Sequence, residues 1–217
     1  MPDAATLLDT LLAPRPAVYP TLPAFRAAWH AAAAGWDTPV DRALIGGGSA
    51  DRLGYAFAAG YTSALERLVP GLVGAACLCV TEEGGAHPRA IRARLTPLDA
   101  GWRLDGKKRW ATLAGEGDTL LVAASTGHEG DHNVLRLARV PADAPGVTLT
   151  ALPPTPFTPE IPHYEVTLDG VVLPHDALLP GDGWTAYVKP FRTVEDAHVC
   201  AAATAYLLGV ARTHAWP

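Results

Sequence analysis

The sequence has few cysteines and no long apolar run, and both features exclude classes of protein. Its 217 residues include only three cysteines, Cys77, Cys79 and Cys200. An odd number without a pairing pattern predicts no disulfide framework. Cys77 and Cys79 lie two apart in a probable strand, which favours small core side chains over the C-x-x-C of a redox or zinc site. No apolar run reaches the ~18 residues that a membrane span needs, and the first residues lack the basic region of a signal peptide. We therefore expect no membrane span and a cytoplasmic location.

Charged residues are also scarce, and basic residues do not exceed acidic ones. Charged side chains make up 18% of the chain, and the formal net charge is −5. Because phosphate backbones are bound by clustered Lys and Arg, this balance argues against nucleic acid as a general partner. The dense basic run Lys107-Lys108-Arg109 is expected to be a solvated strand or hairpin flank. Apolar residues reach 49%, which is ample for a folded core.

Several motifs that mark catalytic and nucleotide sites are missing from the sequence. There is no G-x-S-x-G, and no G-x-G-x-x-G follows a strand, so neither a nucleophile elbow nor a Rossmann site is predicted. The run Gly46-Gly47-Gly48-Ser49 is not followed by the Lys-Ser/Thr of a P-loop, and we expect a flexible linker there. Glu82 and Glu83 are successive strand residues that point to opposite faces, which favours a structural role over an acid–base pair.

One short segment is rich in possible metal ligands. Residues 128–132 (His-Glu-Gly-Asp-His) place four of them within five positions, and imidazole and carboxylate groups suit several metals. Polar residues are also typical of a loop between two strands. We favour the loop and predict no metal site.

Helical periodicity is found at both ends of the chain. Thr21 can cap one helix, and Ser49 or Asp51 can cap another. The last helix is rich in Ala and Leu with few charges, which predicts packing on more than one side. The expected helices cover residues 3–13, 22–34, about 50–68 and 195–212.

Between the helices, short segments alternate with turn signals and indicate strands. Asp105-Gly106 predicts a two-residue hairpin turn. The fold class is therefore α+β, with N-terminal helices (1–70), a central antiparallel β-barrel or sandwich domain (71–183) and the start of a C-terminal helical domain (184–217). The expected strands cover residues 75–81, 91–97, 101–104, 107–112, 119–124, 134–140, 147–152 and 164–168.

Four residues at the ends of these strands are candidates for binding a ligand. Trp110 and Thr112 lie two apart and face one side of a strand, while Val80 and Thr81 end another strand beside a glycine-rich turn. Such groups can hold a planar ring with polar edges. Ordinary sheet packing is the alternative, because Trp and Thr are common in strands.

The order of motifs around these residues resembles the acyl-CoA dehydrogenase family. Val80-Thr81-Glu82 with its glycine-rich turn is similar to the family's T-E-x-G-x-G turn, and residues 106–112 are similar to its G-x-K-x-W-I-T strand. Residues 166–174 and 178–184 resemble the exit from the family's middle β domain. The resemblance covers about residues 77 to 183, and the C-terminal helical bundle is largely absent from the sequence.

The resemblance implies an FAD-dependent oxidoreductase. Thr81 would hydrogen-bond the pyrimidine edge of the flavin with help from the backbone of Val80, Trp110 would lie against the isoalloxazine ring, and Thr112 would approach the N5 side. The substrate would be an acyl-CoA thioester, dehydrogenated between its α and β carbons, with the hydride chemistry supplied by the flavin. The family also implies an electron-transfer acceptor, a homo-oligomer and a role in fatty acid metabolism.

The sequence departs from the family pattern at several positions. His87 and Pro88 stand where Ser and Asp are usual, and Glu83 stands where Pro is usual. The family's catalytic glutamate lies in the helical bundle, so no catalytic residue is assigned here, and no motif places Glu195 or Asp196 at a flavin. The alternative function is a non-catalytic flavin-binding, acyl-binding or interaction module on the same β domain.

Overall fold

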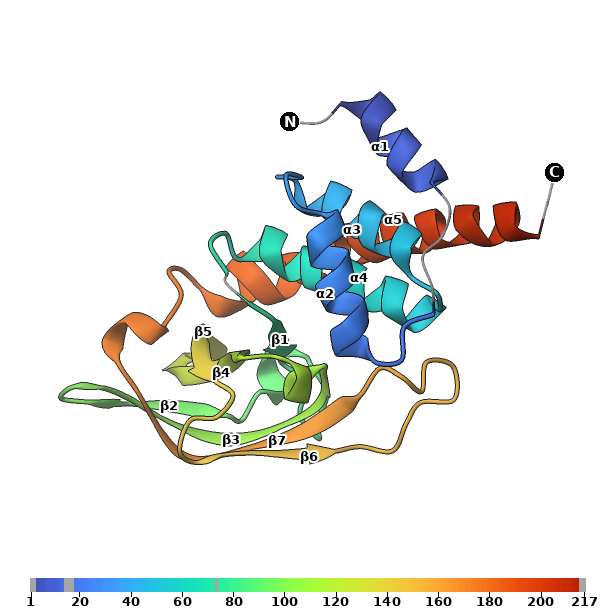
Figure 1. Cartoon of the computed structure of the whole chain (residues 1–217). Coiled ribbons are helices and arrows are strands. Elements are labelled where there is room, and N and C mark those ends of the chain that lie inside the picture. Colours follow the sequence, from blue (N-terminus) through green and yellow to red (C-terminus); the bar gives the residue numbers. More distant parts are fainter. Residues whose placement is uncertain (1–2, 14–17, 73, 215–217) are drawn as a thin grey trace. The chain divides into compact units, whose positions relative to one another are not determined.

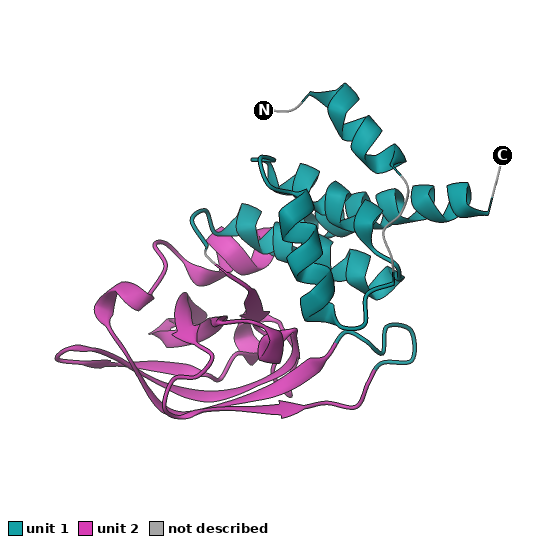
Figure 2. Cartoon of the chain, viewed as in Figure 1, with its two compact units in different colours: residues 1–72, 155–161, 191–217 teal, residues 73–154, 162–190 magenta. Residues whose placement is uncertain are grey.

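The computed structural model describes residues 3–13, 18–72 and 74–214. The chain divides into two compact units (Figure 2). The helical unit comprises residues 1–72, 155–161 and 191–217, and the β unit comprises residues 73–154 and 162–190. The domain boundaries after residues 70 and 183 that the sequence indicates stay predictions.

The first two N-terminal helices follow the sequence pattern closely, whereas the helix over residues 39–49 was not predicted. Asp3 caps α1 by accepting from the Thr6 N–H at 2.8 Å, and the Thr21 hydroxyl caps α2 by accepting from the Ala24 N–H at 3.3 Å. Both helices were predicted, and α2 ends two residues earlier than expected. The helices are α1 (Ala4–Leu12), α2 (Leu22–Ala32), α3 (Pro39–Ser49), α4 (Leu53–Leu68) and α5 (Lys189–Thr213).

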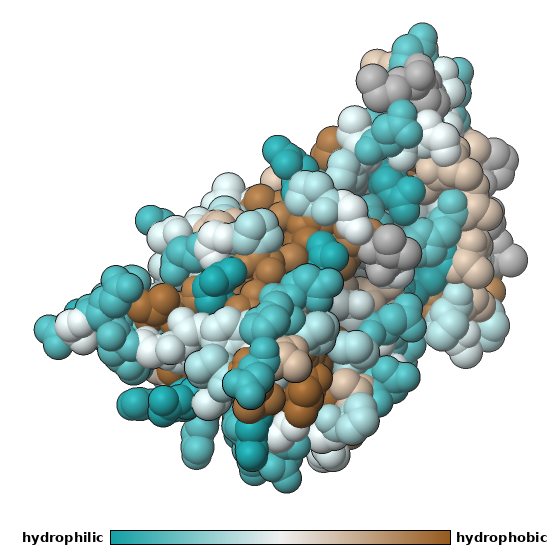
Figure 3. Space-filling model, turned by 90° about the vertical axis from the view of Figure 1, so that its left-hand side faces the viewer, coloured by the Kyte–Doolittle hydropathy of each residue, from teal (hydrophilic) through white to brown (hydrophobic). Residues whose placement is uncertain are grey.

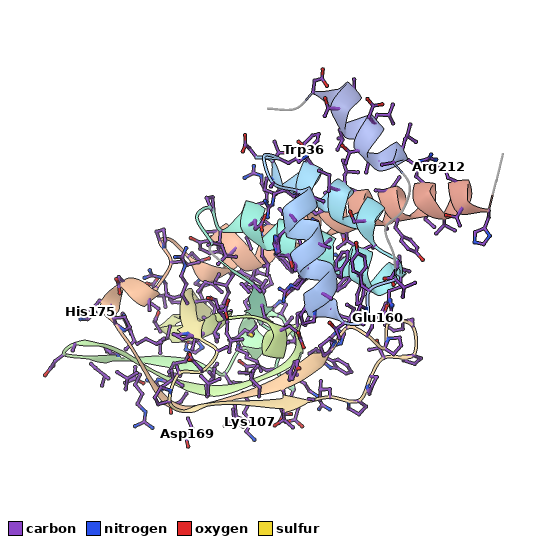
Figure 4. All side chains as sticks on the ribbon, viewed as in Figure 1. Trp36, Lys107, Glu160, Asp169, His175 and Arg212 are labelled. Carbon is purple, nitrogen blue, oxygen red and sulfur yellow. The ribbon has the colours of Figure 1, made fainter. Side chains whose placement is uncertain are left out.

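The start of α4 differs from the prediction. Its N-cap is Arg52, whose side chain makes no capping hydrogen bond, rather than Ser49 or Asp51. A carboxylate from a distant segment replaces the cap, because Glu160 Oε1 accepts from the Gly54 N–H at 3.1 Å. Glu160, labelled in Figure 4, lies in residues 155–161, which belong to the same helical unit as α4. Asp51 instead accepts from the Tyr19 N–H at 3.0 Å.

The glycine-rich run 46–49 is helical, and the prediction of a flexible linker was wrong. It forms the last turn of α3. A Cβ atom on Gly47 would overlap the carbonyl oxygen of Ala202 in α5, and one on Gly46 would lie 2.7 Å from Trp29 Nε1. The glycines therefore allow α3 to pack at close range against its neighbours, which outweighs their low helix propensity.

The β unit contains a curled sheet whose strand order is β1-β4-β2-β3-β7-β6, with β5 paired to β4 (Figure 1). The α+β fold class is confirmed. Most neighbours are antiparallel, but β1 pairs with β4 in parallel, and so does the start of β2, which the sequence pattern did not predict. The strands are β1 (Ala76–Cys79), β2 (Arg94–Leu98), β3 (Gly101–Thr112), β4 (Thr119–Glu129), β5 (His132–Pro141), β6 (Val147–Ala151) and β7 (His163–Leu173).

The hairpin turn predicted at Asp105-Gly106 does not exist. Both residues lie inside β3, which runs unbroken from Gly101 to Thr112. Gly106 has a φ of +149°, and a Cβ atom there would lie 2.6 Å from the Cα of Ala93. Asp105 accepts from the Gly170 N–H of β7 at 2.8 Å. The Asp-Gly pair therefore lies at a register shift of the sheet and allows a close backbone approach there.

The core of the β unit is formed by small and branched apolar side chains. Cys77 and Cys79 belong to it, as expected, and are fully buried. Large hydrophobic residues also remain exposed, among them Leu98, Trp110 and Val172. On the face of the molecule in Figure 3, hydrophobic residues reach the surface in patches between hydrophilic ones.

Candidate functional site

The chain segment after β1 and the second half of β3 are joined by direct hydrogen bonds. The main-chain N–H of Arg109 donates to the Thr81 carbonyl oxygen at 2.7 Å. The Lys108 Nζ donates to the Val80 carbonyl oxygen at 3.2 Å. The structure therefore brings Val80 and Thr81 beside the residues that precede Trp110, although 28 positions separate Val80 from Lys108 in the sequence.

A bulge in β3 exposes Trp110. The register with β7 shifts between Lys108 and Ala111, and Trp110 has a φ of +58°, a left-handed backbone that is uncommon for a tryptophan. Lys108 and Ala111 are buried, while Arg109 and Trp110 between them are exposed. Half of the Trp110 surface is accessible. The bulge thus re-aims an aromatic ring out of the sheet at some cost in backbone strain.

The two threonines complete the group of predicted residues. Thr81 and Thr112 are partly exposed, and within the described part of the chain neither hydroxyl is engaged in a hydrogen bond. Thr112 pairs with His163 of β7. The His163 ring meets the Trp110 ring edge-on, with 5.9 Å between centroids. An open aromatic face and two open hydroxyls therefore lie near the end of β3 and the end of β1.

The expectation that the basic run 107–109 is wholly solvated was wrong for its central residue. Lys108 is 0% exposed and forms an ion pair with Glu82, whose side chain is 8% exposed, at 2.7 Å between Nζ and Oε1. Lys107 points away from the sheet, as Figure 4 shows, and Arg109 is exposed. Burial lowers the pKa of Lys108, and the Glu82 carboxylate opposes that shift.

Glu82 has the structural role that the sequence indicated, in a more specific form. Its Oε2 accepts from the Arg92 N–H at 2.7 Å, and its Oε1 accepts from the Ala93 N–H at 3.0 Å. With Lys108, three donors engage the two carboxylate oxygens. Glu83, by contrast, is exposed, so the two glutamates are not an acid–base pair.

An open hollow of about 710 Å³ lies next to this ion pair. The residues lining it include His87, Arg89, Arg92 and Lys107, with Glu83 as an opposing charge. His87, which departs from the family pattern, caps the short 3-10 turn Pro88–Ala90, and its Nδ1 accepts from the Arg89 N–H at 3.2 Å. Its side chain therefore organises its own loop.

The loop within residues 128–132 is shorter than the sequence suggested. His128 and Glu129 end β4, and His132 begins β5, so only Gly130 and Asp131 form the turn. Glu129 pairs with His132 across the hairpin. Throughout residues 3–13, 18–72 and 74–214, no group of three or more His, Cys, Asp or Glu side chains is arranged to hold a metal ion.

A perturbed carboxylate lies elsewhere, in α5 of the helical unit. Burial raises the pKa of Glu195 to about 7, and the neighbouring Asp196 charge adds to the shift. Of the helices in the described part of the chain, none has the length and apolar character that crossing a membrane requires.

The sheet that carries this site corresponds to a known domain. Residues 77–171 match the model of the acyl-CoA dehydrogenase middle domain. This part of the chain is therefore similar to that domain. The resemblance to this family that the sequence motifs indicated is thereby confirmed.

Individual relatives agree with this assignment. The chain is 31% identical over 139 residues to benzylmalonyl-CoA dehydrogenase of Aromatoleum aromaticum, an alignment that covers 62% of the chain and 35% of the relative. Among solved structures, the prolyl acyl carrier protein oxidase AnaB has a TM-score of 0.71 at 17% identity, over 90% of this chain and 60% of that one. PigA with FAD and proline has a TM-score of 0.67 at 17% identity, over 89% and 59%. The chain therefore spans about a third of the curated relative and about three fifths of these structures.

The sequence pattern did not predict the buried ion pair of Lys108 and Glu82. A signal was present, because Leu104 and Lys108 are four residues apart and share one face of a continuous strand. The hairpin predicted at Asp105-Gly106 divided that strand and hid the alternation. The roles of Val80, Thr81, Trp110 and Thr112 as cofactor contacts stay predictions.

Proposed function

We propose that this chain is the flavin-binding part of an FAD-dependent dehydrogenase that oxidises an acyl-CoA thioester between its α and β carbons. The observation that carries the proposal is the hydrogen bond between the Arg109 N–H and the Thr81 carbonyl. It sets a partly exposed threonine beside the strand that presents the half-exposed ring of Trp110.

The chemistry of these groups fits a flavin. An isoalloxazine ring is planar and aromatic with one polar edge, and it needs an apolar face on one side and hydrogen-bonding groups at that edge. Trp110 offers the aromatic face, and Thr81 and Thr112 offer hydroxyls that both donate and accept. FAD, when bound, supplies the acceptor for the substrate hydride; the protein groups orient it.

Two of the similar proteins support a CoA thioester as substrate and FAD as cofactor. One is a dehydrogenase of a CoA thioester, and one structure was determined with FAD. The thioester carrier is proposed to be CoA, and an acyl carrier protein is the competing carrier because the AnaB oxidase acts on one. An electron-transfer acceptor and a homo-oligomeric assembly belong to the same proposal.

The removal of the substrate α proton needs a base, and Glu82 does not suit that role. Its carboxylate is buried, paired with Lys108 and bound by two main-chain N–H groups, so its oxygens are engaged in structural contacts. No other residue of the β unit is assigned as the base. This observation favours a second candidate function, a flavin-binding or acyl-binding module without turnover.

The proposal is tested by FAD binding to the purified chain, followed by absorbance and by quenching of flavin fluorescence. We expect Thr81→Val with Trp110→Ala to weaken FAD binding by about tenfold or more, since a stacking face and a polar contact are both lost. Thr148→Val with Phe157→Ala is the matched control, because it removes an exposed threonine and an exposed aromatic residue elsewhere. A wild-type chain that binds no FAD up to high micromolar concentrations overturns the proposal.

Activity then separates the two candidate functions. Reduction of an artificial dye in the presence of acyl-CoA thioesters supports the dehydrogenase. The same assay with thioesters on an acyl carrier protein distinguishes the carrier. Bound FAD that no thioester reduces supports the module without turnover.

A further inference from the structure

The ion pair between Lys108 and Glu82 fixes the chain segment that follows β1. Lys108 Nζ bonds both the Glu82 carboxylate, at 2.7 Å, and the Val80 carbonyl, at 3.2 Å. The carboxylate in turn holds the N–H groups of Arg92 and Ala93. Three separate parts of the β unit therefore meet at one buried charge pair.

The same segment is closed from its other side by main-chain bonds. Glu82 and Gly85 exchange hydrogen bonds of 3.1 and 2.9 Å, and the Thr81 carbonyl accepts from Arg109. These contacts use main-chain atoms of residues 80–85 and leave the Thr81 hydroxyl open. The backbone of Thr81 is thus fixed while its side chain remains available to a ligand.

Fold stability alone is a weak reason for such a pair. Two charges lose much hydration free energy on burial, and replacement of a buried pair by neutral groups of similar volume is often neutral or stabilising. A buried pair with directional hydrogen bonds does favour one arrangement of the segments it joins. Here those segments are the end of β1 and the bulged half of β3, which carry Thr81 and Trp110.

We propose that Lys108 and Glu82 are positioning residues of the flavin site, which hold the main chain at Val80–Thr81 in register with Trp110 so that both contact one flavin ring. The inference rests on the proposed function. Neither residue touches the flavin itself in this scheme; both act through the main chain of the segment that they tie to β3.

The test compares FAD affinity with stability in the double variant K108M/E82Q, which replaces the pair by neutral side chains of similar shape. The control is R103M/D105N, which neutralises an exposed ion pair in the same strand, 2.9 Å between Nε and Oδ2. Far-ultraviolet circular dichroism gives the melting temperature. FAD affinity is measured well below it, where every variant is folded. We expect K108M/E82Q to bind FAD about tenfold or more weakly than wild type, with a shifted flavin absorption band, and the control to bind as wild type does.

Each outcome decides the inference. If K108M/E82Q is folded and binds FAD with wild-type affinity and spectrum, the pair is structural only and the inference is overturned while the proposed function stands. If K108M/E82Q does not fold, Glu82→Asp replaces it, because a shorter carboxylate keeps the charge but loses reach to Arg92 and Ala93; unchanged affinity in that variant likewise overturns the inference. If wild type binds no FAD, the proposed function and the inference fail together.

Discussion

Lys108 and Glu82 form a buried ion pair, 2.7 Å between Nζ and Oε1. Lys108 lies in β3, whose other basic residues are exposed. The pair ties the end of β1 to β3, and Arg109 and Trp110 follow it in the bulge. The candidate site thus depends on Lys108, whose charged side chain is buried, next to Arg109 and Trp110, whose side chains are exposed.

The first prediction concerns the stability of this pair. Lys108→Met alone leaves the Glu82 carboxylate buried without its cation, and we expect it to lower the free energy of unfolding by about 3–5 kcal/mol. K108M/E82Q removes both charges, so it should recover most of that loss, although the Val80 carbonyl is then short of a donor. Urea denaturation of wild type, both single variants and the double variant gives the coupling energy. Additive effects of the single changes would contradict the prediction.

The second prediction separates close packing from backbone strain at Gly106 of β3. Gly106 and Gly127 have nearly the same φ, +149° and +145°. A Cβ atom on Gly106 would lie 2.6 Å from the Cα of Ala93, whereas one on Gly127 would meet nothing within 4 Å. Both Ala variants therefore carry the conformational penalty, of about 1 kcal/mol or more.

The contact with Ala93 adds to that penalty at one site only. Gly106→Ala should accordingly lose about 2 kcal/mol or more beyond the loss in Gly127→Ala. Thermal denaturation of the two variants in parallel measures the difference. Equal losses would mean that the chain at Ala93, just before β2, moves freely away from β3 and that the approach there has no energetic weight.

These glycines also show how far the sequence determined the fold. The helices α1, α2 and α4, the cap at Thr21 and the buried cysteines were predictable, because they depend on local spacing and capping chemistry. The structures of Gly46–Gly48 and Asp105-Gly106 were not predictable from the sequence. A glycine can indicate either a turn or a close approach of two backbones, and the sequence does not distinguish them. Only the partner at Ala202 or Ala93 tells the two apart.

The candidate site divides in the same way. The motifs around Thr81 and Trp110 indicated a family and a set of ligand contacts, since they stand in the same order as the motifs of that family. The left-handed backbone of Trp110 needed the β3–β7 register, which shifts between Leu104 and Gly106 and again between Lys108 and Ala111. The inward direction of Lys108 was hidden by the hairpin predicted at Asp105-Gly106. A bulge changes which residues share a face, and alternation in the sequence alone does not locate it.

The third prediction tests the helical counterpart of this close packing. Gly47→Ala places a methyl group against the backbone of Ala202, which has no side-chain freedom to yield. We expect a loss of about 2–4 kcal/mol in the free energy of unfolding. Gly48→Ala is the matched control in the same helix, because its methyl group would meet only the end of the Leu11 side chain, at 2.9 Å.

Since alanine has the higher helix propensity, Gly48→Ala should be neutral or stabilising by up to about 1 kcal/mol. Both variants are compared by urea denaturation followed by circular dichroism. A Gly47→Ala protein as stable as Gly48→Ala would show that α3 and α5 do not need their close approach at Ala202.

The fourth prediction concerns pH and Glu195. Burial and the Asp196 charge raise the pKa of Glu195 from 4.5 to about 7 in the folded chain. Between these values the folded state holds a proton that the unfolded state has lost, so the contribution of Glu195 to stability falls as pH rises from about 4.5 to about 7 and is constant on either side. The stabilising contribution of the protonated carboxyl is complete below the lower value.

Glu195→Gln cannot ionise, and its stability should lack this slope. It should therefore melt a few degrees above wild type at about pH 8 and close to wild type near pH 4.5, with the difference reduced by solvent around a partly exposed group. Asp196→Asn removes the neighbouring charge and should move the wild-type slope to lower pH. Melting curves of the three proteins across this range check the prediction, and parallel curves for wild type and Glu195→Gln would refute it.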